Sequence, residues 1–149
     1  MPLQLHRAAG WGLVAYISGL ALIALWPVPV DRAGGQLLAR ALRKLHRRGV
    51  PEWVDYGFVE SASNVLLFVP LGALVVWLLG RPYGWVGPAA GLLLSSLIEL
   101  AQFLFLPERY PTLADVAANT SGAVIGALLA LLTTAYRKPV RSPPPARTL

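Results

Sequence analysis

The chain has 149 residues, of which 56% are hydrophobic and only 13% charged, so a soluble fold would lack the polar surface needed to cover its core. It has no cysteine, which excludes disulfides, thiolate chemistry and Cys-ligated metal centres, and we expect neither a metal ion nor a cofactor. The net charge of +6 comes from clusters outside the apolar runs, which favours contact with anionic lipid and not with nucleic acid.

The first apolar run covers residues 8–26 and is long enough to cross a bilayer, which takes about 20 residues of helix. His6 and Arg7 precede it, as in a signal peptide. No small-x-small cleavage site follows, however, so we interpret the run as a retained first transmembrane helix.

A basic segment, residues 36–48, separates the first run from the second. Its leucines fall on one arc of a helix, and its cations fall on the opposite side. These cations are Arg40, Arg43, Lys44 and Arg47. The pattern predicts a short amphipathic helix in the headgroup layer. A solvated helix that merely packs on the bundle is the alternative.

Three more apolar runs follow, at residues 61–79, 83–106 and 113–135. Pro70 lies inside the second run, where proline frees a carbonyl and kinks a helix. Residues expected to shape helix packing are Pro70, Gly72, Gly122 and Gly126. The sequence thus predicts an all-α polytopic membrane protein, with one four-helix bundle over residues 1–136 and a disordered, basic, Pro-rich tail over 137–149.

Polar side chains inside the apolar runs are the candidate functional residues, because a buried polar group is costly in a bilayer unless it has a partner. Antiparallel packing brings the start of the second span, the end of the third and the start of the fourth to one membrane face. The polar residues there are Asn64, Glu99, Gln102, Arg109, Asp115 and Asn119. Glu99 lies seven residues before Leu106, about 10 Å deep, and Arg109 is its expected partner.

Several of these residues also have purely structural interpretations. Thr112 and Asp115 fit a capping box at the start of the fourth span. Asn119 fits a hydrogen bond between helices, and the glycines fit close helix packing. An intramembrane carboxylate such as Glu99 is a functional candidate by default.

Three motifs in this region resemble the VanZ-like family. Residues 64–72 match N-x-x-x-F-x-P-x-G, and residues 96–102 match S-x-x-E-x-x-Q. Arg109 followed by residues 115–126 is similar to R…D-V-x-x-N-T-x-G-x-x-x-G. The motif region spans residues 60–130, about half of the chain. The family takes its name from a protein that gives low-level resistance to the glycopeptide teicoplanin. The resemblance implies four or five membrane helices, an extracytoplasmic motif face and an N-terminus inside the cell.

We therefore expect a protein of the inner (cytoplasmic) membrane, with both termini in the cytoplasm, that binds or assists the handling of lipid-linked envelope or surface-glycan material. Two alternatives stay open. The first is an enzyme that acts on a polyprenyl-phosphate-type lipid, with magnesium held by Glu60, Glu99 and Asp115. The second is a small transporter or a structural subunit of an envelope-assembly complex. The expected partners are membrane lipids, a second copy of the chain or envelope-assembly proteins. Charge alone leaves the orientation open, because the two sides carry six and seven cations.

Overall fold

The computed structural model describes residues 3–25, 31–106 and 112–136, and every regular element in these ranges is a helix. In chain order the elements are α1 (Leu3–Ala24), α2 (Asp31–His46), α3 (Tyr56–Leu79), the 3₁₀ helix η1 (Arg81–Tyr83), α4 (Val86–Phe105) and α5 (Leu113–Tyr136). α1, α3, α4 and α5 are each long and apolar enough to cross a membrane. The prediction of an all-α membrane protein with four spans is confirmed. The tail over 137–149 lies outside the described residues.

Helix boundaries differ from the predicted ones where local capping decides them. α3 begins at Tyr56 and not at residue 61, because the Asp55 carboxylate accepts a hydrogen bond from the Phe58 backbone N–H (2.9 Å) and so caps the helix. α3 ends at Leu79 and is capped by Gly80, which adopts a positive φ of 86°. Tyr83 lies in η1, so α4 begins at Val86 and not at residue 83.

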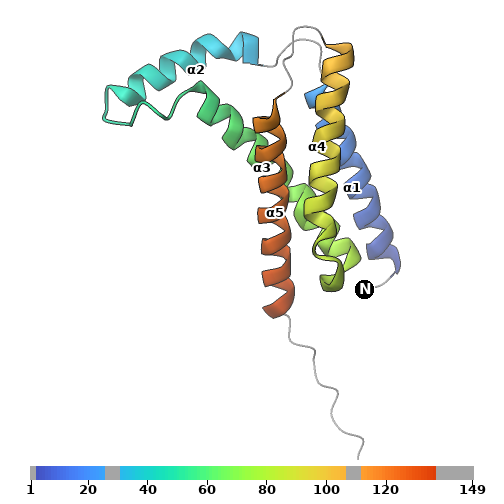
Figure 1. Ribbon diagram of the computed structural model, residues 1–149. Helices are drawn as coiled ribbons and strands as arrows, with labels where there is room; N and C mark the ends of the chain where they lie inside the picture. The colour runs from blue at the N-terminus through green and yellow to red at the C-terminus, as the bar shows by residue number, and fades with distance from the viewer. Residues whose placement is uncertain (1–2, 26–30, 107–111, 137–149) are drawn as a thin grey trace, which may run out of the picture.

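α1, α4 and α5 run along the bundle, α3 crosses it at a slant, and α2 extends sideways from one end (Figure 1). The start of α1 and the end of α5 lie at the opposite end (Figure 1). α3 packs most extensively on α5, and α4 packs on both. α1 is the outermost span, with only 6% of its apolar window buried.

Small residues allow the backbones of α3 and α5 to touch. A Cβ atom added at Gly122 or Gly126 would collide with the backbone carbonyls of Val65 and Val69, and one added at Gly72 would collide with that of Ala123. Glycine is therefore required at these three places by the close approach of two helices. Pro70 is exposed and lies apart from this contact, within the continuous helix α3.

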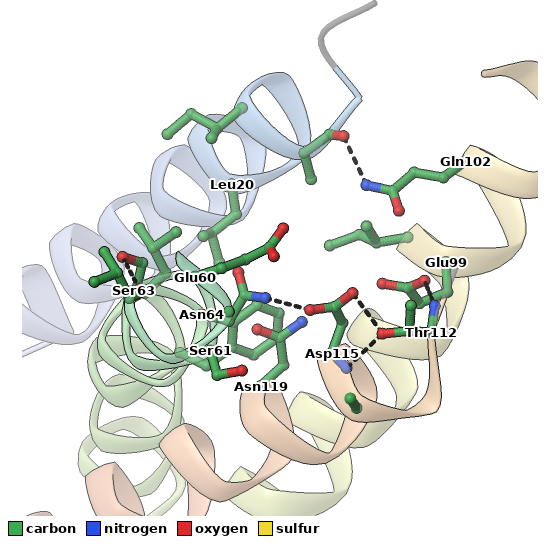
Figure 2. A pocket seen from close by; sticks show the side chains of 18 of the residues that line it. Leu20, Glu60, Ser61, Ser63, Asn64, Glu99, Gln102, Thr112, Asp115 and Asn119 are labelled. Carbon is green, nitrogen blue, oxygen red and sulfur yellow. Dashed lines mark hydrogen bonds between the residues drawn. The ribbon is translucent and has the colours of Figure 1, made fainter. Parts of the chain in front are cut away.

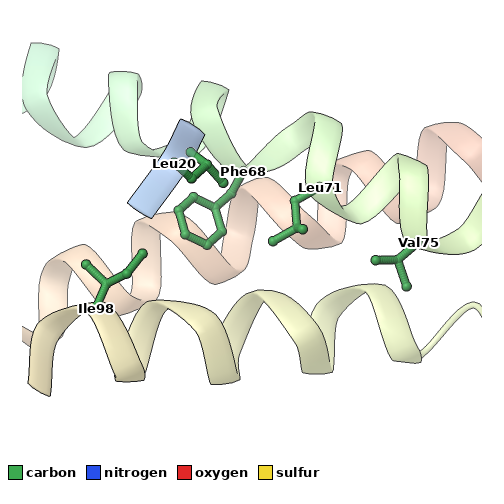
Figure 3. Packing of buried hydrophobic residues seen from close by; sticks show 5 residues of the cluster. All are labelled: Leu20, Phe68, Leu71, Val75 and Ile98. Carbon is green, nitrogen blue, oxygen red and sulfur yellow. The ribbon is translucent and has the colours of Figure 1, made fainter. Parts of the chain in front are cut away.

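One apolar core cluster joins α1, α3 and α4, and its buried members are Leu20, Phe68, Leu71, Val75 and Ile98 (Figure 3). A second cluster joins α3 and α5 through Ala73, Val76, Ala127 and Ala130. Many other large apolar side chains point outward, among them Leu93 at 63% exposure and Phe105 at 74%. Such an outward apolar surface suits a lipid environment, in which the exterior is as apolar as the core.

α2 has the amphipathic character that its sequence predicts. Leu42 is buried and Leu38 is half-buried, whereas the cations Arg40, Arg43 and Lys44 are all exposed. Arg47, just beyond the helix, is exposed as well. Because α2 extends sideways from the bundle and not along it (Figure 1), its orientation suits a helix in the plane of the headgroups.

Replacing Arg40, Arg43 and Lys44 by glutamine should weaken the association of anionic lipid with the protein by about fivefold for each cation removed at low salt, since each contributes about 1 kcal/mol near a membrane surface. Electron spin resonance of spin-labelled phosphatidylglycerol, relative to phosphatidylcholine, would measure the change. Arg81→Gln, at the other end of the bundle, is the control. An equal loss in the control would contradict the role of α2.

Candidate functional site

A pocket of about 760 Å³ lies toward the end of the bundle from which α2 extends, and residues from all five α-helices line it (Figure 2). Five of the six predicted cluster residues lie in its lining: Asn64, Glu99, Gln102, Asp115 and Asn119. The sixth, Arg109, lies outside the described residues. The antiparallel arrangement of α3, α4 and α5 thus brings the polar side chains together, as the sequence argument expected.

Asp115 connects the start of α5 to α3. Its Oδ1 accepts a hydrogen bond from Asn64 Nδ2 (2.7 Å), and its Oδ2 accepts one from the Thr112 hydroxyl (2.7 Å; Figure 2). The Asp115 backbone N–H donates in turn to Thr112 Oγ1 (3.0 Å). The capping interaction and the contact between helices therefore occur in the same residue, so the structural and the functional interpretations of Asp115 do not exclude each other.

Glu99 connects α4 to the residue that precedes α5. Its Oε2 accepts a hydrogen bond from the Thr112 backbone N–H (2.9 Å; Figure 2). A hydrogen bond from a backbone N–H stabilises a carboxylate. Thr112 thus links Glu99 to Asp115, and the two carboxylates hold the start of α5 in place.

Asn119 and Gln102 each donate a hydrogen bond to another helix. Asn119 Nδ2 donates to the hydroxyl of Ser95 (2.9 Å), a fully buried residue of α4. Gln102 Nε2 donates to the backbone carbonyl of Ala24 (2.9 Å), near the end of α1 (Figure 2). The Ala24 carbonyl belongs to the last turn of α1, where carbonyls have no partner within the helix. Gln102 therefore fixes the outermost helix against the pocket.

The apolar part of the lining comes from residues that the polar pattern did not identify. α1 contributes Leu20 and Ile23, α2 contributes Leu38, and the early part of α3 contributes Tyr56 and Val59. The apolar arc of α2 could have predicted the contribution of Leu38. Asp55, as a helix-capping residue, could have predicted that α3 begins at Tyr56. α1 docks on α3 through Tyr16, whose hydroxyl donates to the Leu67 carbonyl (2.6 Å). The sequence could not predict this contact, because a single tyrosine in an apolar run indicates no particular partner.

The pocket is amphipathic. One part of its lining consists of carboxyl, amide and hydroxyl groups, and the other consists of aliphatic and aromatic side chains from α1, α2 and α3. Within the described residues, no group of three or more His, Asp or Glu side chains could hold a metal ion. Glu60, Glu99 and Asp115, which the sequence suggested as magnesium ligands, all line the pocket but do not form such a group. The arrangement suits a molecule with a polar head and an apolar chain.

Comparison with known proteins gives one positive result. The family described as VanZ/LLP1 matches residues 13–134, a segment that contains all six residues of the predicted cluster. Neither a curated protein nor a solved structure matches the chain.

Proposed function

The chain belongs to the VanZ/LLP1 family, and from that premise we propose that its pocket binds the polar headgroup of a lipid-linked cell-envelope precursor at the extracytoplasmic face of the membrane. The observation that carries the proposal is the composition of the pocket, in which hydrogen-bonding side chains of α3, α4 and α5 face an apolar wall from α1 and α2. Amide and carboxylate groups suit sugar hydroxyls, and the apolar wall suits the first part of a lipid chain.

The place of the pocket in the bundle supports a lipid ligand. Its lining includes Leu38 of α2, whose exposed cations and apolar face suit the headgroup layer. A lipid headgroup would reach this level of the protein without leaving its own leaflet. In this proposal Arg109, which follows α4 in the sequence, is the bidentate donor to a phosphate of the ligand.

The proposal requires the pocket end to face outward and both termini to face the cytoplasm. Because the chain has no cysteine, single cysteines can be introduced without background labelling. We expect Glu52→Cys, in the exposed segment between α2 and α3, to react with a membrane-impermeant thiol reagent in intact cells. Arg81→Cys, in η1 at the other end, should react only after the membrane is permeabilised.

The reverse labelling pattern would place the pocket in the cytoplasmic leaflet and rule out a ligand at the cell surface. Labelling of both positions after permeabilisation is the internal control, since it shows that each cysteine is accessible in the folded protein. Both residues are exposed and neither lines the pocket, so the substitutions should leave folding unchanged.

A further inference from the structure

Four spans surround the pocket, and hydrogen bonds close three of the seams between them at its level. Gln102 of α4 donates to a carbonyl of α1, and Asn64 of α3 donates to Asp115 of α5 (Figure 2). Glu99 of α4 accepts from Thr112, the residue before α5 (Figure 2). These contacts hold α1 to α4, α4 to α5 and α5 to α3.

The fourth seam, between α1 and α3, is held in a different place. Its hydrogen bond, from the Tyr16 hydroxyl to the Leu67 carbonyl, lies nearer the middle of the bundle, and Tyr16 does not line the pocket. Between this contact and the end of α1, residues 20–25 are all aliphatic. At the level of the pocket, α1 therefore has no side chain that could form a hydrogen bond to α3.

The side chains along this seam line the pocket and are also exposed. Leu20 and Ile23 follow Tyr16 on one face of α1, and Ser63 lies one turn before Leu67 on α3. Ile23 is 50% exposed although it lines the pocket, and Ser63 is exposed as well. The pocket is therefore open to the side between α1 and α3, over about 10 Å of helix from Tyr16 to Ile23.

The opening suits an apolar chain. Leu20 and Ile23 are aliphatic, and the Ser63 hydroxyl donates to the Val59 carbonyl of its own helix (2.7 Å), so it is satisfied without water. We propose that the hydrophobic chain of the ligand leaves the pocket through this opening and enters the bilayer between α1 and α3. The inference rests on the proposed function and adds the orientation of the ligand, with its head toward α4 and α5 and its chain against α1.

Protection of single cysteines tests the contact directly, with undecaprenyl phosphate as the probe and the full chain in detergent micelles. At a probe concentration about ten times its Kd, the reaction of Ile23→Cys with N-ethylmaleimide should slow about tenfold, because about a tenth of the sites remain free. Leu22→Cys is the matched control. Leu22 is the neighbouring residue, 66% exposed and outside the lining, so the rate at this position should stay the same.

A bulky side chain in the opening should weaken binding. We expect Ile23→Trp to lower the retention of undecaprenyl phosphate, measured by native mass spectrometry, about tenfold, which corresponds to the lost burial of about two methylene groups. Leu22→Trp adds the same bulk outside the pocket and should leave retention unchanged.

Equal protection of Ile23→Cys and Leu22→Cys, or equal losses in the two tryptophan variants, would overturn the inference and leave the proposed lipid site standing. Protection of Ala114→Cys, at the exposed start of α5, in place of Ile23→Cys would also overturn it, because the chain would then pass α5. If the unaltered protein did not retain undecaprenyl phosphate, the proposed function would fail together with the inference.

Discussion

Replacement of Gly126 by alanine is expected to lower the free energy of unfolding by about 2 kcal/mol or more, even though alanine is the better helix former by about 1 kcal/mol. The new Cβ atom would collide with the Val69 carbonyl and would lie 2.9 Å from the Ala73 nitrogen. These are backbone atoms, which cannot rotate away as the end of a side chain can. The helices α3 and α5 would have to separate, and their packing would be lost along the whole contact. Reversible unfolding in detergent micelles, followed by circular dichroism, would measure the effect.

Gly19→Ala is the matched control. Gly19 lies in α1, and a Cβ atom added there would have no neighbouring atom within 4 Å. The same chemical change should therefore be neutral, or stabilising by up to about 1 kcal/mol through helix propensity. Similar losses of stability at positions 19 and 126 would show that the cost arises from the glycine residue itself and not from the contact between α3 and α5.

The glycines show what residue spacing can and cannot predict. Gly122 and Gly126, four residues apart, predicted a face for close packing, and the structure places them against α3. The spacing could not identify α3 as the partner, because any helix with a smooth face would satisfy it. Pro70 was grouped with Gly72, but two residues differ by about 200° around a helix. Gly72 therefore packs on α5 while Pro70 is exposed.

The candidate site was predictable to a similar extent. Helical spacing and antiparallel order were enough to bring Asn64, Glu99 and Asp115 to one end of the bundle, because both follow from regular geometry. The contribution of α1 was not predictable, because it depends on how an apolar helix docks. The hydrogen bond from Gln102 to the Ala24 carbonyl uses a backbone group that every sequence has, so no residue pattern could signal it.

Asp115→Ala should have the largest effect on the pocket, because Asp115 both stabilises the start of α5 and holds Asn64. Removal of the carboxylate leaves the Asn64 amide without this partner in a half-buried place, and it takes away the acceptor of the Thr112 hydroxyl. We expect the free energy of unfolding to fall by about 2–3 kcal/mol. We also expect the retention of lipid, measured by native mass spectrometry, to fall at least about tenfold, since a hydrogen-bonding group and the ordered lining are lost together.

Asp55→Ala allows the loss of a helix cap to be separated from the loss of the site. Asp55 caps α3 through the Phe58 N–H, but it does not line the pocket. Its replacement should cost about 1 kcal/mol of stability and leave lipid retention unchanged. If Asp115→Ala and Asp55→Ala reduced stability equally and neither affected lipid retention, Asp115 would be only a capping residue. A loss of lipid confined to Asp115→Ala, measured at a temperature where both variants are folded, would instead assign its carboxylate to the binding site.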